Sequence, residues 1–280
     1  ATDLRVAAIR LLGSADGLRE DDFQLMRRLL APRAPLDIQR AVVETLAGRT
    51  EDLAAEVLLA GWRSHSPEIR GRVLDALASR KSWVGMILQA LEVGAIRANE
   101  LNASGRQQML KIGGNSAALG KALAVTASTE RADVLRRFKS ALTLSGDVER
   151  GATIFRKRCI SCHKFKDEGH DVGPQLASIT SKSKEALWTS ILDPNAAVDA
   201  KYFNYAVITE GGRVFTGKMQ SETGSSITLL AAEGKQTTIL RRDIEELQAS
   251  DTSVMPEGLE KELTPQDLAD LIRFIQQSFR

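Results

Sequence analysis

Apolar residues recur at intervals of three and four along the first 144 residues, a spacing that places them on one face of an α-helix. Two such segments align. Arg40-Ala-Val-Val-Glu-Thr-Leu-Ala-Gly48 matches Gly71-Arg-Val-Leu-Asp-Ala-Leu-Ala-Ser79 at an offset of 31 residues, and second helices are predicted over 21–30 and 51–62. A period in the thirties with two helices per repeat predicts an α-solenoid of HEAT type over 1–144, with an irregular helical bundle as the alternative.

Three residues in this region are candidates for a site of their own. Trp62 and Trp83 fall within the helical pattern, and we expect them to lie in the core between helices. His65 stands in the segment Ser-His-Ser-Pro, which is typical of a loop. We therefore expect His65 to face the solvent, and we assign a function to none of the three.

After residue 144 the pattern changes. Asp147 is a suitable N-cap for a helix that runs through Phe155, and 183–192 predict another short helix. Residues 202–241 then alternate with a period of two in four short segments, with glycine-containing turns between them. This alternation predicts a small antiparallel β module, inserted at about 202–247. Within it, 243–247 are expected to return to helix or turn.

The C-terminal segment carries the clearest helix signal in the chain. Thr264 is a good N-cap, and Pro265 stands at the first helical position, where its missing N–H costs nothing. The positions that follow place four apolar residues on one face: Leu268, Leu271, Ile272 and Ile275. A helix packed on a core is predicted from this pattern.

Composition and net charge narrow the fold class and the kinds of partner. The chain has 280 residues, of which 43 % are hydrophobic and only 5 % aromatic, with a formal net charge of +2. This balance favours a mostly α protein with two domains, 1–144 and 145–280, and speaks against nucleic acid or an anionic membrane as partner. No apolar run is long enough to span a membrane. The chain opens without methionine or signal peptide, and we expect a mature product or a piece of something longer.

The strongest chemical signal is Cys159-Ile160-Ser161-Cys162-His163, which holds the only two cysteines of the chain. Two thiols three positions apart, followed by an imidazole, suit a haem c that is attached through two thioethers and ligated by His163. A thioredoxin-type motif would need a preceding strand, and a zinc site would need a fourth ligand. Covalent haem implies an oxidising compartment, so we expect a periplasmic or otherwise extracytoplasmic protein.

Residues 151–280 resemble the haem c-binding domain of planctomycetes and verrucomicrobia, a relative of class I cytochrome c. The resemblance rests on these segments: Gly151-x-x-x-Phe155, Cys159-x-x-Cys162-His163, Gly173-Pro174-x-Leu176, Ile191-Leu-Asp-Pro194, Tyr202, Gly211-Gly-Arg-Val214, Met255-Pro256 and Thr264-Pro-x-Asp-Leu-Ala-Asp-Leu271. In that family helical repeats commonly precede the haem domain. The resemblance therefore implies a cytochrome c-like helical domain, interrupted by the β module, behind HEAT-like repeats.

The resemblance also implies roles for single residues. Gly151 would let the first helix of the domain cross the last helix closely. The Pro174 carbonyl would accept a hydrogen bond from His163 Nδ1, Leu176 would pack on the haem face, and Met255 would supply the sixth iron ligand. Small cytochromes c place that methionine nearer to the haem motif. An insertion with close ends costs little closure entropy, so the longer spacing here is compatible with Met255.

The sixth ligand is open at the level of sequence. Met255 stands in a loop before proline, whereas Met26, Met86 and Met109 lie in the helical repeats and Met219 lies on a predicted strand. His170 follows His163 by seven residues in a glycine-rich loop and is the competing ligand. The third alternative is an open position that would bind a small molecule.

These features predict an electron-transfer protein with one haem and no catalytic activity of its own. The resemblance implies a periplasmic dehydrogenase as electron donor, and a downstream acceptor. A basic rim beside the haem motif would dock an acidic partner: Arg156, Lys157, Arg158, Lys164 and Lys166. The alternatives are a haem sensor or scaffold that binds a partner through the repeats, and a haem peroxidase if the sixth position is open. A homodimer through unpaired strands is a further expectation to be tested.

Overall fold

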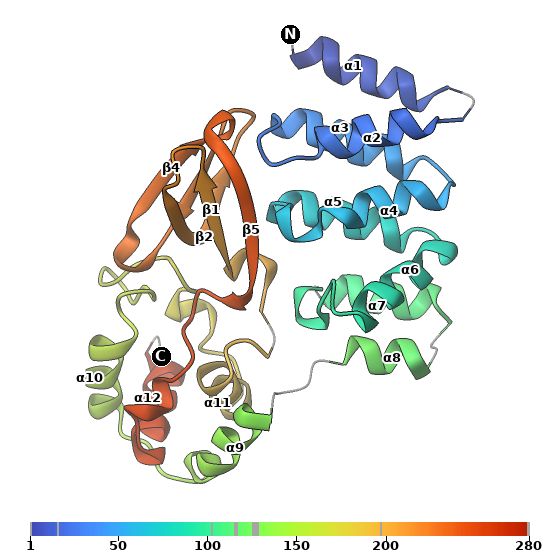
Figure 1. The fold of residues 1–280 in the computed structure, drawn as a ribbon. Helices are drawn as coiled ribbons and strands as arrows, with labels where there is room; N and C mark the ends of the chain where they lie inside the picture. The colour runs from blue at the N-terminus through green and yellow to red at the C-terminus, as the bar shows by residue number, and fades with distance from the viewer. Residues whose placement is uncertain are drawn as a thin grey trace. The chain divides into compact units, whose positions relative to one another are not determined.

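The computed structural model describes residues 2–15, 17–101, 103–114, 117–124, 129–196 and 198–278. These residues form a mostly helical protein with one five-stranded sheet (Figure 1). The chain divides into two compact units. Unit 1 comprises 1–124, 204–229 and 237–251, and unit 2 comprises 125–203, 230–236 and 252–280.

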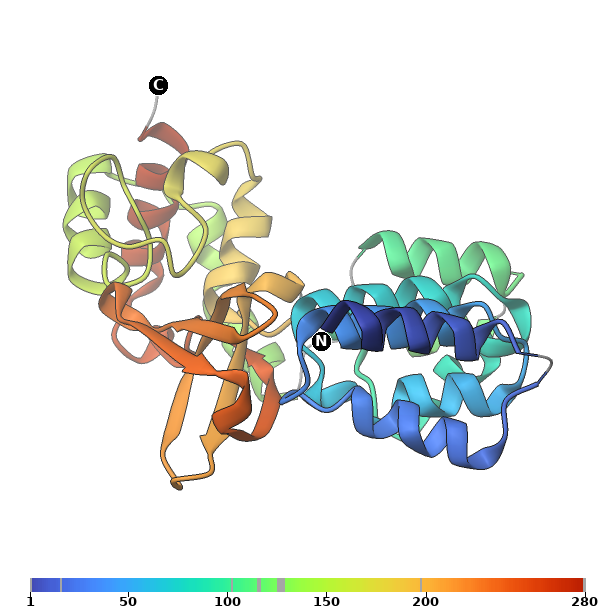
Figure 2. The same ribbon diagram turned by 90° about the horizontal axis from the view of Figure 1, so that it is seen from above.

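The helices of unit 1 stack in two layers. One layer contains α1 (Thr2–Gly13), α3 (Leu36–Ala47), α5 (Pro67–Ala78) and α7 (Ala103–Ile112), each packed on the next. The other layer contains α2 (Glu20–Leu29), α4 (Asp52–Ala60), α6 (Lys81–Glu92) and α8 (Ala117–Leu123), and it stacks in the same order. Figure 2 shows the stack from above. Alternation of consecutive helices between two layers is the arrangement that a repeat of two helices would produce.

Buried side chains in both layers form one hydrophobic core. Trp62 and Trp83 belong to it, with exposed fractions of 3 % and 0 %, as expected from the helical pattern. His65 contradicts its prediction: its side chain is buried at 1 % exposure, and Nε2–H donates to the Leu58 carbonyl at 3.1 Å. Only His65 and Ser66 of the Ser-His-Ser-Pro segment lie between helices, because η1 (Trp62–Ser64) ends at Ser64 and α5 begins at Pro67. The imidazole turns inward against Gly61, where a Cβ would meet its ring at 2.7 Å.

The sheet has the order β4-β3-β2-β1-β5. Its strands are β1 (Phe203–Thr209), β2 (Val214–Glu222), β3 (Ser226–Leu230), β4 (Gln236–Leu240) and β5 (Ile244–Ser253). β1 and β2 are antiparallel, with Tyr205 opposite Gly217. The fifth strand corrects the prediction of helix or turn at 243–247. Ile244 and Leu247 are spaced by three like helical residues, but pairing beside β1 extends this segment and buries both side chains.

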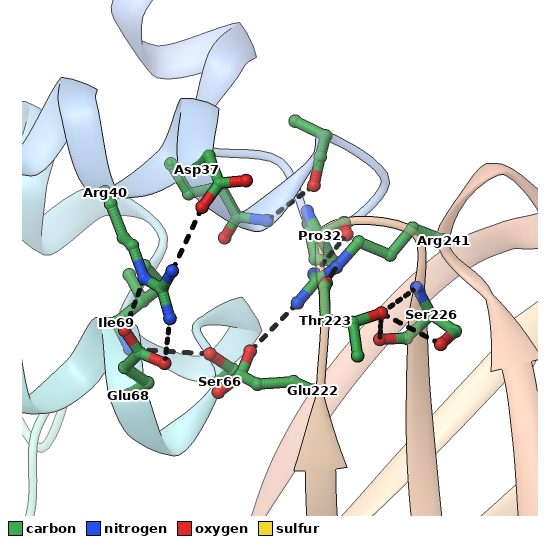
Figure 3. Close-up of polar contacts among 12 residues, drawn as sticks. Pro32, Asp37, Arg40, Ser66, Glu68, Ile69, Glu222, Thr223, Ser226 and Arg241 are labelled. Carbon is green, nitrogen blue, oxygen red and sulfur yellow. Dashed lines mark hydrogen bonds and ion pairs between the residues drawn. The ribbon is translucent and has the colours of Figure 1, made fainter. Parts of the chain in front are cut away.

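A buried arginine ties the sheet to the helices within unit 1 (Figure 3). Arg241 is 2 % exposed, and its guanidinium donates to the carbonyls of Pro32 at 3.0 Å and Thr223 at 2.8 Å. It also pairs with Glu222 at 2.9 Å. Pro32 belongs to the loop before α3, so one side chain links this loop to the end of β2 and the turn that follows it. Contacts therefore group most of the sheet with the helical layers, whereas the two sequence domains, 1–144 and 145–280, stay a prediction.

Unit 2 is built around a pair of crossing helices. These are α10 (Val148–Arg158) and α12 (Pro265–Gln277), and α9 (Thr129–Arg137) and α11 (Lys184–Leu192) lie in the same unit. The predicted caps are confirmed. The Asp147 carboxylate accepts from Arg150 N–H at 2.8 Å, and Thr264 Oγ1 accepts from Asp267 N–H at 3.1 Å. The four apolar residues predicted for the last helix are all buried.

Candidate cofactor site

The site is held by the crossing of α10 and α12. Gly151 lies at this crossing, where a Cβ would collide with the Asp270 carbonyl and meet Phe274 Cβ at 2.7 Å. Glycine is therefore needed for the close approach of the two helices. Arg150 fixes the crossing by pairing with the buried Asp270 carboxylate at 2.8 Å. Beneath it, Phe155 packs on the Phe274 ring with 5.5 Å between centroids.

The attachment segment begins where α10 ends. Cys159 is the C-cap of this helix, and its carbonyl accepts from His163 N–H at 2.9 Å, so the motif continues as one tight turn. The loop that follows folds back on the motif, because the Cys162 carbonyl accepts from the N–H groups of Val172 and Gly173 at 3.0 and 2.7 Å. These backbone bonds fix the two thiols and the imidazole as one rigid segment.

The His163 ring is oriented by two neighbours. Its Nδ1–H donates to the Pro174 carbonyl at 2.8 Å, the contact that the resemblance implies. Gly173 lies flat against the ring, since a Cβ there would come within 2.5 Å of Cε1. Burial lowers the pKa of His163, and the hydrogen bond to Pro174 opposes this effect only in part. The imidazole is therefore neutral, and no polar group among the described residues contacts Nε2, the nitrogen left to ligate a metal.

A cavity of about 490 Å³ opens on this ring. All six residues that the sequence assigned to the cofactor line it: Cys159, Cys162, His163, Pro174, Leu176 and Met255. The rest of its wall comes largely from α11, from the 194–202 segment and from α12. A mostly pre-formed pocket of several hundred cubic ångströms with a mainly apolar lining surface suits a large flat cofactor. The thiol pair, the free imidazole nitrogen and this cavity together fit a haem.

The two candidate sixth ligands occupy different places. Met255 is half-buried, packs against the core of unit 2 and lines the cavity. His170 does not line it, and its ring instead lies on Gly234, where a Cβ would approach Nδ1 to 2.6 Å. Gly234 belongs to the β3–β4 turn, which is attached to the motif because Glu233 N–H donates to the Ser161 carbonyl at 2.8 Å. Met255 thus shares the cavity with His163, and His170 is not among the residues that line it.

The thiols show the effect of the same burial. Burial raises the pKa of the Cys159 thiol to about 12, and the neighbouring Cys162 adds to the shift. Both cysteines are free of disulfide bonds. Within the described ranges, no group of three or more His, Cys, Asp or Glu side chains is arranged to hold a metal ion.

The basic rim is largely neutralised by acidic side chains. Arg156 pairs with Glu168 at 3.0 Å, Arg158 pairs with Glu262, and Lys164 approaches Asp171 to 4.0 Å. Lys166 lies over the Phe165 ring at 5.2 Å. Lysine and arginine side chains with a carboxylate partner offer a weaker field to an approaching protein.

Sequence reasoning missed Asp193. This residue lies in the Ile191-Leu-Asp-Pro194 segment that contributed to the resemblance, but no role was assigned to it. The structure buries its side chain to 4 % exposure in the cavity wall. The sequence feature that could have pointed to Asp193 is an acidic residue between Leu192 and a proline, at the end of an apolar helix.

No helix among the described residues is long and apolar enough to cross a membrane.

Comparison with known proteins places a family on part of this chain. Residues 148–200 match the family model of cytochrome c. A cytochrome c of Arabidopsis thaliana is 44 % identical over 36 residues, which cover 12 % of this chain and 32 % of the plant protein. The chain thus spans about a third of that relative. Cytochromes c bind haem c covalently through cysteines and are typically electron carriers rather than enzymes. Cys159 and Cys162, the cysteines of this chain, both lie within the matched residues.

Proposed function

We propose that this protein is a one-electron carrier with a single haem c, attached through Cys159 and Cys162 and ligated by His163. One observation carries the proposal: two thiols, a neutral imidazole with a free Nε2 and a thioether line a single cavity. The bound haem supplies the chemistry, which is the reversible uptake of one electron at iron.

Residues around the cavity orient the His163 ligand, exclude water and influence the reduction potential. Pro174 holds the imidazole in one orientation and makes His163 a more basic ligand. Leu176 is 1 % exposed, and with the other apolar wall residues it excludes water from the cavity. Met255 is the sixth ligand in this proposal. With haem bound, a thioether and an imidazole as its two protein ligands would raise the reduction potential relative to harder ligands and would leave no iron position for a substrate.

We further propose an extracytoplasmic location and a redox partner, such as a periplasmic dehydrogenase. The resemblance to planctomycete and verrucomicrobial haem domains supports both, and the two helical layers of unit 1 are compatible with HEAT-type repeats. The ion pairs of the basic rim make a purely electrostatic docking mode less favourable than the sequence alone indicates. Lys157 is an exposed cation of that rim, and we assign it the main electrostatic contribution.

Absorption spectra of the protein matured with haem test this function. We expect a low-spin haem in both redox states, and in the oxidised state the weak long-wavelength charge-transfer band of methionine-ligated iron. Met255→Ala should abolish that band and lower the reduction potential, because the thioether ligand is lost. Met86→Ala is the matched control, since Met86 is also half-buried but packs in the core of unit 1.

Two results would contradict the proposal. A Met255→Ala spectrum identical to that of the unchanged protein removes Met255 as ligand. A high-spin spectrum that shifts on addition of cyanide shows an open iron position, and it supports the sensor or peroxidase alternative in place of electron transfer.

A further inference from the structure

Asp193 is a buried carboxylate that the proposed site does not use. It follows α11, where its N–H donates to the Thr189 carbonyl at 2.7 Å. Its side chain is 4 % exposed and forms part of the cavity wall. Among the described residues, no hydrogen-bond donor reaches its Oδ2. An ionised carboxylate in such a place has lost its hydration without receiving full compensation.

The cation that acts on Asp193 supplies only part of that compensation. Arg131 on α9 is engaged elsewhere: its Nη1 donates to the Leu192 carbonyl at 3.0 Å, and its Nη2 pairs with the buried Glu260 at 2.9 Å. Arg131 Nε also lies 3.9 Å from Glu257, whose own charge acts on Asp193. The guanidinium is therefore shared among several carboxylates, and its charge lowers the pKa of Asp193 only in part.

Burial raises the pKa of Asp193, and the charge of Glu257 raises it further. The charge of Arg131 and hydrogen bonds from the backbone of Ala196 and Asn195 lower this pKa in part. The other charged residues that line the cavity are Lys182, Asp199 and Lys201, and the last two pair at 3.6 Å. Asp193 thus differs from Asp199, which is exposed and has a partner. Of the described carboxylates that line this cavity, Asp193 is the buried one.

We propose that Asp193 binds the proton that accompanies electron uptake at this site. The inference rests on the proposed electron-transfer function. One electron taken up at a bound haem would add one negative charge to the cavity, and the Asp193 carboxylate would then bind one proton from water. The O–H bond formed on Asp193 breaks again when the electron leaves, and the proton returns to water. The protein then carries one electron together with one proton.

The midpoint potential as a function of pH tests this coupling. Electron uptake linked to one proton shifts the redox equilibrium tenfold per pH unit, which corresponds to about 59 mV for one electron. We expect the potential of the haem-loaded protein to fall with rising pH, with a slope approaching this value in a window above the ordinary titration range of aspartic acid. Asp193→Asn should abolish the slope in that window. Asp199→Asn, in the same wall, should retain it.

A second measurement does not depend on the variant folding. In the unchanged protein, the reduced-minus-oxidised infrared spectrum should contain the C=O stretch of a protonated carboxylic acid, shifted in D₂O. Absence of that band, or an unchanged potential slope in Asp193→Asn, overturns the inference while the carrier function stands. Absence of any reversible one-electron wave in the unchanged protein overturns the carrier function, and this inference with it.

Discussion

His65 is buried and His163 is half-buried, and their surroundings give the two histidines different uses. His163 keeps Nε2 open towards a cavity, whereas His65 donates Nε2–H to Leu58 and leaves Nδ1 without a partner in the described core. Protonation of His65 would place a second N–H, and a charge, in apolar surroundings. Burial accordingly lowers the pKa of His65 from 6.5 to about 4, and the nearby charge of Arg70 acts in the same direction.

We expect His65 to make the stability of unit 1 fall in mild acid. Between pH 6.5 and about 4 the unfolded histidine binds a proton that the folded one does not, so the free energy of unfolding decreases as pH falls. The slope approaches roughly 1.4 kcal/mol per pH unit. Urea denaturation at about pH 7 and about pH 5 measures it, and His65→Gln should be less sensitive to this change. Equal losses in both proteins would place the acid sensitivity elsewhere.

For single residues, the sequence predicts which side chains can bind a cofactor better than it predicts which side chains are buried. Cys159, Cys162 and His163 are recognisable because bonding to a haem demands those residue types at that spacing. Nothing in the local sequence of His65 or Asp193 tells whether the side chain turns inward, because burial depends on helices distant in the chain. From sequence, His65 is therefore predicted to face the solvent, and Asp193 has no assigned role. The predicted ligands, His163 and Met255, line one cavity in the structure.

At the scale of elements, the attachment of the sheet to the helices in unit 1 depends on Arg241. Its replacement by methionine leaves the buried Glu222 carboxylate without its counter-charge, and removal of one partner of a buried pair costs about 3–5 kcal/mol. We expect Arg241→Met to lower the free energy of unfolding by that order, as measured in urea. The neighbouring Arg242→Met is the control. Arg242 has a side chain 82 % exposed and should contribute less than about 1 kcal/mol.

A double variant separates charge from packing in this contact. Arg241→Met combined with Glu222→Leu leaves no unpaired charge, and it should recover most of the lost stability. If the double variant is as unstable as Arg241→Met alone, the bonds to the Pro32 and Thr223 carbonyls hold the sheet rather than the ion pair.

The elements themselves follow from sequence where periodicity and caps agree. The last helix is predicted in full, from Thr264 through its buried face. β5 is not predicted, because its apolar residues at 244 and 247 carry the spacing of a helix, and only pairing beside β1 makes the segment a strand. Strands depend on partners from other parts of the chain, so their local signal is weaker.

For the whole molecule, the two units carry separate hydrophobic cores. The cofactor would fill the cavity beside the core of unit 2 only. We expect a Cys159→Ala, Cys162→Ala double variant, which cannot attach haem, to lose protection from amide hydrogen exchange in α10, α11 and α12. Helices α3 to α6 of unit 1 should keep theirs. Equal loss of protection in both groups of helices would mean that the two cores unfold as one.

The crossing of α10 and α12 has a consequence for how the protein is made. A chain synthesised from its N-terminus presents the motif at 159–163 long before α12, which begins at Pro265. Until α12 docks against Gly151, nothing completes the burial that suppresses the Cys159 thiolate. Because thioether formation needs a reactive, accessible thiol, we expect maturation to precede closure, with the C-terminal helix sealing a cofactor that is already attached.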